Sequence, residues 1–292
     1  MVCAVTTYLV GLDGSDHARD ALEWARSVAT EHEQIVVAHS WEVPITSAYE
    51  PVAPIDAMDV EGMAREFLDD QVRECADARV TGRLVTGHAG RSLVDLADEV
   101  GTEATVVVGH GGSTKASLLL GSTAHYVIHH TDVPVVVVRG ELRLPVRRVV
   151  VGVDEGRDHA PDAPSLAALR WAVRLPGVIE VQVAHADFVP GVAAGPVREP
   201  GVEPDAEVED DDSAMRAAIT EVTDGTGVAP NGATIAPVVA AGTGAFALIE
   251  ASREVDLVVI GTRGRSGLVE LIVGATGLEV TAHAHCPVAV VR

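Results

Sequence analysis

The sequence predicts an α/β protein made of two tandem domains, each a five-stranded, mainly parallel sheet in a doubly wound layout with helices on both faces. Three observations lead to this prediction. The 292 residues fit two domains of roughly 140 to 150 residues better than one. One unit is written twice, and in each copy Val- and Ile-rich runs alternate with segments of helical apolar spacing. Apolar residues make up 47% of the chain but aromatic residues only 3%, which favours layers filled by small aliphatic side chains.

The duplication is visible as three segments of the first half that recur in the same order in the second. The spacing between matched residues grows along the chain, so the copies differ by insertions. The break falls at "GELRLP" (140–145), and we predict domains at residues 1–142 and 143–292. The matched segments are "YLVGLDGSDHARDALEWA" (8–25) with "VVVGVDEGRDHAPDAPSLAALRWA" (149–172), "IVVAHSW" (35–41) with "VQVAHAD" (181–187), and "TDVPVVVVR" (131–139) with "AHCPVAVVR" (284–292).

In the first copy the aliphatic runs predict strands, and the segments between them predict helices. Trp24 falls on the apolar face of the first such helix, and Trp171 occupies the same place in the second copy, so we expect both in the core. Strands without polar alternation are buried on both faces, and ligands of such sheets bind at the carboxyl ends of the strands. The Pro-rich, acidic stretches 42–62 and 188–212 predict loops. The predicted strands lie near residues 7–12, 35–40, 83–87, 104–108 and 133–138.

Charge and composition exclude several classes of protein. The formal net charge is −22 and Lys115 is the single lysine, so nucleic acid and anionic membranes would be repelled. The three cysteines have no CxxC spacing, which indicates neither a disulfide framework nor a zinc site. The longest aliphatic runs have about six residues, far fewer than a bilayer span needs, and the N-terminus lacks the basic region of a signal peptide. We expect a cytoplasmic protein that binds neither nucleic acid nor membrane.

A glycine-rich stretch follows an aliphatic run in each copy. The two stretches are "GHGGSTKASLLLGST" (109–123) and "GTRGRSGLVELIVGAT" (261–276). A glycine turn after a parallel strand lets backbone N–H groups approach a ligand, and the following helix adds its positive N-terminal end, so the pattern predicts phosphate binding. The spacing is neither GxxxxGK[ST] nor GxGxxG, which argues against a P-loop or a classical dinucleotide site. The alternative is that these glycines serve only tight turns and helix packing.

With these motifs the chain resembles the universal stress protein family in its tandem two-domain form. The family signature is Gly, two residues, Gly, nine residues, then Gly followed by Ser or Thr, and the stretch at 261–276 comes close to it. "VGLDGS" and "VGVDEG" match the family's first strand, "VVAHSW" and "VAHAD" its second, and "VPVVVV" and "CPVAVV" its last. The resemblance covers nearly the whole chain apart from the two predicted loops. It implies two Rossmann-like or flavodoxin-like domains.

The resemblance also implies a ligand, ATP, with or without Mg²⁺. In ATP-binding members the glycines hold the phosphates, the Ser or Thr hydroxyl adds a bond, the first-strand aspartate faces the ribose, and the residue after the second-strand histidine presents its backbone to adenine. In the first half the implied contacts are Gly11, Asp13, Ser40, Val108, Gly109, Gly112, Gly121, Ser122 and Thr123. In the second half they are Gly152, Asp154, Ala186, Ile260, Gly261, Gly264, Gly274 and Thr276.

Both halves depart from the family pattern. The first glycine loop is one residue short, which shifts Gly112 by up to about 3.5 Å or brings Gly111 to the phosphate-facing position. In the second half Ala275 replaces the expected hydroxyl, with Thr276 as a substitute, and an insertion follows Asp154. Losing one charge-assisted hydrogen bond would cost about 1.5 to 3 kcal/mol. We expect both sites to bind, with the first half preferred.

Other residues have plainer interpretations. Asp13 and Asp154 could instead cap the next helix. The histidines of "HYVIHH" (125–130) include an i, i+4 pair, but the sequence offers no acidic or cysteine partner beside them, so we predict no metal site. His39 and His185 should form internal hydrogen bonds within the sheet. We predict no catalytic residues, because neither a hydrolase triad nor a poised general base is indicated.

These observations lead us to expect an adenine-nucleotide-binding stress-response sensor or regulator, not a turnover enzyme. The alternatives are a nucleotide-free interaction module of the same fold, and a slow ATPase or nucleotidyl transferase. The resemblance further implies that the last strands of the two halves, 133–138 and 287–291, pair across a pseudo-twofold interface. Two chains would then associate as a homodimer.

Overall fold

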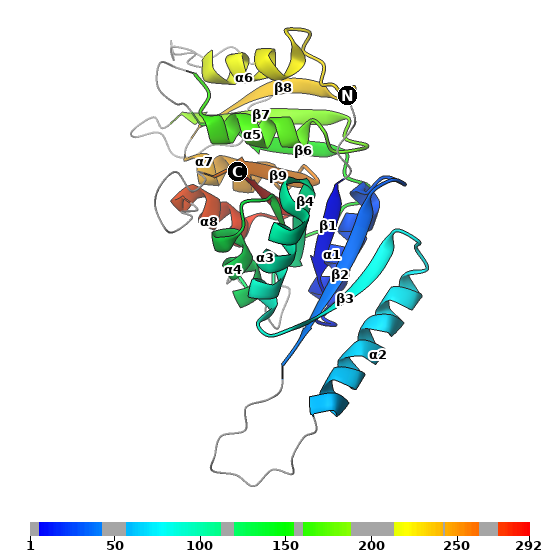
Figure 1. Cartoon of the computed structure of the whole chain (residues 1–292). Helices are drawn as coiled ribbons and strands as arrows, with labels where there is room; N and C mark the ends of the chain where they lie inside the picture. The colour runs from blue at the N-terminus through cyan, green and yellow to red at the C-terminus, as the bar shows by residue number, and fades with distance from the viewer. Residues whose placement is uncertain are drawn as a thin grey trace.

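The computed structural model describes residues 6–42, 57–111, 120–154, 160–187, 213–241, 243–262 and 274–292. The predicted α/β class and its mostly parallel sheet are confirmed (Figure 1). The first half contains β1 (Thr7–Gly11), α1 (Asp16–Val28), β2 (Gln34–Trp41), α2 (Ala57–Cys75), β3 (Val80–Thr86), α3 (Ala89–Val100), the 3₁₀ turn η1 (Gly101–Glu103), β4 (Ala104–Gly109), α4 (Ser122–His130) and β5 (Val135–Val138). The second half contains β6 (Arg148–Gly152), α5 (Ala163–Ala172), β7 (Glu180–Asp187), α6 (Ser213–Thr223), β8 (Thr234–Ala241), α7 (Gly244–Ala251), β9 (Leu257–Gly261), α8 (Ala275–His283) and β10 (Val288–Val291).

The described strands form one ten-stranded sheet in the order β3-β2-β1-β4-β5-β10-β9-β6-β7-β8. Neighbours within each half are parallel, whereas β5 and β10 are antiparallel and join the halves. At this junction Val135 lies opposite Val290 and Val137 opposite Val288. From β1 the chain adds β2 and β3 on one side, and then β4 and β5 on the other side. The gap between the parallel strands β1 and β4 is therefore the topological switch point, where doubly wound sheets bind ligands.

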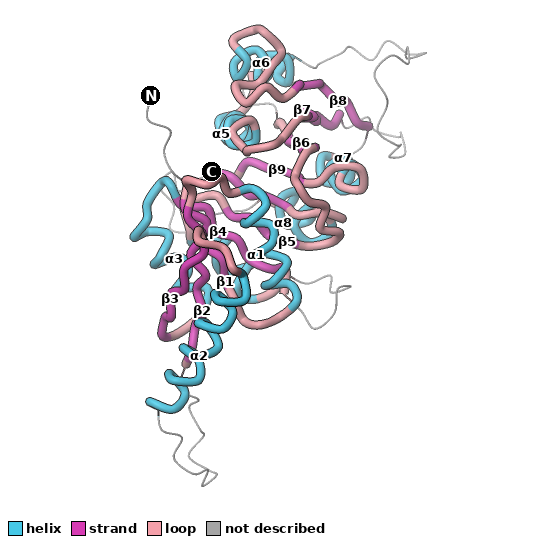
Figure 2. Tube along the Cα trace, turned by 90° about the vertical axis from the view of Figure 1, so that its right-hand side faces the viewer, coloured by secondary structure: helices cyan, strands magenta, loops and turns pink. Residues whose placement is uncertain are grey.

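Helices lie on both sides of the strands (Figure 2). The pleat divides the apolar side chains between two cores, because successive residues of a strand point to opposite faces. Val10 faces the core under α1, α2, α5 and α6, and its neighbour Leu9 faces the core under α3, α4, α7 and α8. Each core contains residues of both halves.

Both tryptophans lie where we predicted them: Trp24 belongs to the core that contains Val10, and Trp171 packs against that core. Trp24 is fully buried, and its ring meets Tyr8 edge-on with centroids 6.3 Å apart. Trp171 is half-buried and packs against the same cluster. None of the described helices is both long and apolar enough to cross a bilayer.

Two predicted boundaries were wrong. Strand β3 spans Val80–Thr86 instead of 83–87; it is the edge strand, and only its first residue is buried, so its apolar pattern is weak. Helix α2 begins at Ala57, inside the stretch predicted as a loop over 42–62, because Leu68 and neighbouring apolar residues bury one helix face against β2 and β3. Residues 43–56 and the second predicted loop, 188–212, lie outside the described residues.

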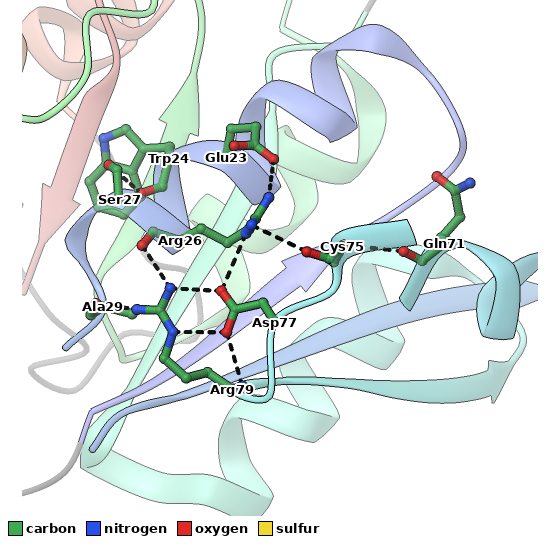
Figure 3. A network of polar contacts seen from close by, with 9 residues as sticks. All are labelled: Glu23, Trp24, Arg26, Ser27, Ala29, Gln71, Cys75, Asp77 and Arg79. Carbon is green, nitrogen blue, oxygen red and sulfur yellow. Dashed lines mark hydrogen bonds and ion pairs between the residues drawn. The ribbon is translucent and has the colours of Figure 1, made fainter. Parts of the chain in front are cut away.

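An ionic network anchors the edge of the sheet to α1 (Figure 3). The Asp77 carboxylate accepts hydrogen bonds from Arg79 Nη2 at 2.7 Å and from Arg26 Nε at 3.3 Å. Arg79 also donates to the carbonyls of Arg26 and Ala29 at the end of α1, and Arg26 donates to the carbonyl of Cys75 at the end of α2. Cations at helix C-termini are favourable because the last carbonyls lack intrahelical partners. The network therefore joins α1, α2 and β3.

The connector between the halves is held by close backbone contact. Gly140 has a φ of +62°, and a Cβ there would lie 2.2 Å from the carbonyl oxygen of His285. Glu141 N–H donates to the same carbonyl at 2.7 Å. Only glycine satisfies both the backbone conformation and the approach.

Gly140→Ala should destabilise the protein by about 1 to 3 kcal/mol or more, because it adds left-handed strain and a collision with backbone. The control is Gly232→Ala, where φ is +85° but nothing lies within 4 Å of the added Cβ. Urea unfolding would measure both. Equal losses in the two variants would show that the contact with His285 is unimportant.

The Asp77 network should make stability depend on pH. The hydrogen bonds from Arg79 are the largest cause that holds the pKa of the Asp77 carboxyl well below its usual range. A depressed folded-state pKa contributes stability above the unfolded value, near 3.9, that is lost as pH falls further. Asp77→Asn should therefore cost about 1 to 3 kcal/mol at pH 7, and the difference between the two proteins should shrink progressively as the pH falls below 4. A pH-independent difference in unfolding midpoints would contradict this.

Candidate functional site

A cavity of about 320 Å³ opens at the carboxyl ends of β1, β2 and β4 in the first half. This volume falls at the lower end of the range of small-molecule sites. The predicted first-half residues that belong to the described chain all line it: Gly11, Asp13, Ser40, Val108, Gly109, Gly121, Ser122 and Thr123. Gly112 lies outside the described residues, whereas Gly111, the alternative, lines the cavity. The topology therefore brings together residues from four separate segments.

Glycines let the backbone segments around the cavity approach one another. A Cβ on Gly109 would lie 2.6 Å from the carbonyl oxygen of His17, at the start of α1. Gly111 has a φ of +78°, and a Cβ on it would lie 2.9 Å from Gly121 Cα. Gly121 N–H donates to the carbonyl of His110 at 2.8 Å, which closes the loop at its base. The glycines thus have a packing role, and they also bring peptide groups to the wall of the cavity.

Helix α4 starts at this wall. Its N-cap is Gly121, which has no side chain to accept a hydrogen bond from the first turn. The first N–H groups of a helix have no intrahelical acceptor and carry the positive end of its dipole. Ser122 and Thr123, whose side chains carry hydroxyls, are the first two residues of this helix and also line the cavity. This end of the cavity therefore offers hydrogen-bond donors to an anion.

The structure decides against the capping interpretation of the two aspartates. Ser15 is the N-cap of α1, where its side chain accepts from Ala18 N–H, and Asp162 is the N-cap of α5. The Asp13 carboxylate instead accepts the N–H of Ser15 at 2.9 Å, which stabilises the turn after β1. Asp13 is exposed at the cavity.

Histidines on the second strand of each half form the predicted internal hydrogen bonds. His39 Nδ1–H donates to the carbonyl of Leu12 at 2.8 Å, and His185 Nδ1–H donates to that of Val153 at 3.0 Å. Each contact fixes the backbone just before the first-strand aspartate. The Ser40 hydroxyl donates to the carbonyl of Gly87. Because this hydroxyl is engaged, the backbone of Ser40 is the better candidate for ligand contact.

The glycine turn has a buried imidazole at its centre. His110 is 4% exposed, its Nδ1 contacts the carbonyl of Gly111 at 3.0 Å, and its Nε2 has no partner within the described residues. Burial, followed by the charge of Arg139, lowers the pKa of His110 from its ordinary value. Among the residues that line the cavity, the ionisable side chains are Asp13, His17 and His39.

The second half repeats the backbone frame with different details. A Cβ on Gly261 would lie 2.2 Å from the carbonyl oxygen of Pro164, in the same way that Gly109 abuts α1. The exposed Asp154 is the last described residue before 155–159, and its N–H donates to Ser165 Oγ at 2.8 Å. The remaining predicted residues occupy positions equivalent to the first half: Gly152 ends β6, Ala186 lies in β7, Ile260 and Gly261 end β9, and Gly274 and Thr276 begin α8. Gly264 lies outside the described residues.

Several residues that line the first cavity were not predicted. Val85, Ala89 and Leu93 come from β3 and α3, and Ser15 and His17 come from the start of α1. The signal for Ser15 was present, because Ser shortly before a helical pattern is a common N-cap. The β3 and α3 contribution depends on the pairing of β2 with β3, which a weakly apolar edge strand does not reveal.

The histidines of α4 form ring contacts. His125 and His129 have centroids 4.5 Å apart, and Tyr126 stacks on His130 at 3.9 Å. Within the described part of the chain, no three His, Cys, Asp or Glu side chains are grouped so that they could hold a metal ion.

Comparison with known proteins identifies the relatives of this chain. The sequence profile of the universal stress protein family matches residues 5–139 and again 145–292. A universal stress protein of Mycolicibacterium smegmatis is 27% identical over 313 residues, covering 100% of this chain and 99% of the relative. One from Mycobacterium tuberculosis is 28% identical, covering 97% and 95%. The crystal structure of a universal stress protein from Archaeoglobus fulgidus has a TM-score of 0.69 at 18% identity and covers 98% of both chains.

Gly109→Ala should destabilise the first half by about 1 to 3 kcal/mol, because the added methyl group meets the backbone of His17 and pushes α1 away from β4. Gly62→Ala in α2 is the matched control; nothing lies within 4 Å of that Cβ, and alanine inside a helix should stabilise by about 0.5 to 1 kcal/mol. Chemical denaturation of both variants would measure this. Wild-type stability in Gly109→Ala would disprove the close approach.

Proposed function

Because the chain belongs to the universal stress protein family, we propose that it binds an adenine nucleotide, ATP, with or without Mg²⁺, at the carboxyl edge of each half. In this proposal the protein acts as a sensor or regulator in the stress response, and the bound nucleotide is its signal. The observation that carries the proposal is the first-half cavity, where the glycine turn, Asp13 and the start of α4 converge.

The phosphate end of the nucleotide would lie against the start of α4. Unpaired helix N–H groups, a positive helix end and two hydroxyls form a typical anion site. The protein as a whole carries a formal charge of −22, so it repels a triphosphate at long range. At physiological ionic strength the Debye length is about 8 Å, so local donors decide the affinity. A bound Mg²⁺ would reduce the remaining repulsion.

The ribose and base would extend toward β1 and β2. The exposed Asp13 carboxylate is an acceptor suited to ribose hydroxyls, and the hydrogen bond from Ser15 N–H holds it in place. Backbone groups near Ser40 would meet the adenine edge, flanked by the apolar side chains of Val85, Leu93 and Val108. Adenine sites commonly combine such an apolar wall with a few polar groups.

The second half would be the weaker site. Its helix α8 begins with Ala275, so Thr276 supplies the first hydroxyl. Loss of one charge-assisted hydrogen bond weakens binding by about tenfold or more. Domain boundaries at 142/143, a cytoplasmic location and association of two chains into a homodimer belong to the same proposal.

Two rival functions make different predictions. A nucleotide-free interaction module would carry no nucleotide and gain no stability from ATP. A slow ATPase would release phosphate above background. We favour binding over turnover, because His39 Nδ1–H is engaged with the carbonyl of Leu12 and the Asp13 carboxylate is assigned to the ribose, which leaves His17 as the other ionisable side chain of the described lining.

The test of the proposal is the nucleotide content of the purified protein. Heat denaturation followed by chromatography of the supernatant should release adenine nucleotide. For protein stripped of ligand, ATP and Mg²⁺ at 100 times Kd should stabilise the fold by about 2.7 kcal/mol per site. An empty protein that shows no thermal shift at millimolar ATP would reject nucleotide binding.

The double variant Ser122→Ala/Thr123→Val should weaken one of two ATP sites at least tenfold, because both hydroxyls at the phosphate end are removed. Titration calorimetry would measure the site affinities. The control is Ser27→Ala, whose hydroxyl donates to the carbonyl of Trp24 in α1 and should not affect binding. Unchanged affinity in the double variant would place the phosphates elsewhere.

A further inference from the structure

Two arginines, one from each half, donate hydrogen bonds across the junction to a helix of the opposite half. Arg139 follows β5, and its Nη1–H donates to the carbonyl of Thr281 in α8. Arg292 follows β10, and its Nη2–H donates to the carbonyl of Ile128 in α4. The two arginines are 153 positions apart in the sequence, and so are the two carbonyls. The contacts are therefore equivalent under the internal duplication, as in an isologous interface.

Each contact lies at the far end of a helix that begins at a candidate nucleotide site. Ile128 is in the last turn of α4, and Thr281 is in the last turn of α8. The carbonyls of a last turn have no intrahelical partner and carry the negative end of the helix dipole, so a guanidinium there is favourable. A nine-residue helix is about 13 Å long. Arg292 thus fixes the end of α4 whose other end carries Ser122 and Thr123.

The two guanidinium groups are costly to place at this junction. Burial lowers the pKa of Arg139 to about 10 and lowers that of Arg292 as well. A guanidinium nevertheless stays charged at neutral pH. Arg139 Nε and Arg292 Nε and Nη1 are buried and have no hydrogen-bond partner within the described residues. Incompletely paired buried charges contribute little net stability. The stability of the junction therefore does not by itself account for the two buried guanidinium charges.

A charge in this environment acts over a longer range than one at the surface, because the low local dielectric screens it weakly. Arg139 therefore acts on both halves: its hydrogen bond reaches α8 in the second half, and its charge contributes to the lowered pKa of His110 beside the first glycine turn. The hydrogen bond of Arg292 reaches α4 in the first half.

We propose that Arg292 and Arg139 are positioning residues for the nucleotide site of the opposite half. Arg292, in the second half, holds α4 and supports anion binding in the first-half cavity. Arg139, in the first half, does the same for α8 and the second-half site. Each site is therefore completed by a residue of the other half. This inference rests on the proposed function.

The test is peptide-resolved hydrogen exchange of the full-length chain during an ATP titration with Mg²⁺. Protection of the first turns of α4 and α8 reports the two sites separately. Arg292→Gln should raise the ATP concentration that half-protects α4 about threefold to tenfold and leave α8 unchanged. Arg139→Gln should raise the ATP concentration that half-protects α8 by a similar factor and shift α4 less, because the Arg139 charge also reaches the first glycine turn. Arg292→Lys retains the charge and should recover most of the affinity, and it remains informative if Arg292→Gln folds poorly.

The matched control is Arg143→Gln in the connector. Its guanidinium bonds the carbonyl of Val255 and the Glu141 carboxylate, neither of which belongs to α4 or α8, so the variant should not shift either site. Equal weakening of both sites by Arg292→Gln would overturn the proposal, as would lack of rescue by Arg292→Lys. A wild-type protein without any ATP-dependent protection would reject nucleotide binding itself, and this inference with it. Wild-type protection that is unchanged in both glutamine variants would reject only the arginine role.

Discussion

The antiparallel pairing of β5 with β10 is the contact on which the rest of the architecture depends. It converts two parallel sheets into one and covers an edge that each half would otherwise leave open. The two cores extend across the junction, with Val136 and Ala289 facing one and Val137 and Val288 facing the other. The same pairing brings the residue after each last strand next to a helix of the opposite half. Without it, neither arginine would reach its carbonyl acceptor.

The two halves share the same backbone arrangement around the candidate sites and differ in individual side chains. The histidine bond from the second strand to the turn after the first, and the close approach of a glycine to the start of the next helix, occur in both. These contacts are made largely by backbone, so insertions before α5 and a shortened loop after β4 do not disturb them. What differs are individual side chains: Ser122 against Ala275 at the start of the helix, and the buried His110 against the buried Thr262 behind the glycine turn. Duplication has preserved geometry while allowing the two edges to diverge in chemistry.

The sequence predicted those parts of the fold whose residues are buried on both sides. The run of valines in β4 and the aliphatic half of β2 are unmistakable because no polar residue interrupts them. The predicted start of the edge strand β3 was wrong because the exposed Thr81, Gly82 and Arg83 interrupt its apolar pattern. In the candidate site, the glycines and Asp13 could be predicted from the sequence, because a backbone without a side chain and a carboxylate are properties of the residue type itself. The contacts from Arg139 and Arg292 were not, since a carbonyl acceptor has no sequence signature and its location depends on tertiary packing.

The two central strands are neighbours in the sheet but far apart in the sequence, and this separation has a consequence during protein synthesis. Val135 pairs with Val290, and a ribosome adding about 5 to 20 residues per second needs roughly 8 to 30 seconds to synthesise the residues between them. During that time the first half can already fold, but its all-valine strand β5 remains an unpaired, apolar edge. Such edges template aggregation. The nascent chain therefore passes through a period in which this central edge can pair with the strands of other chains.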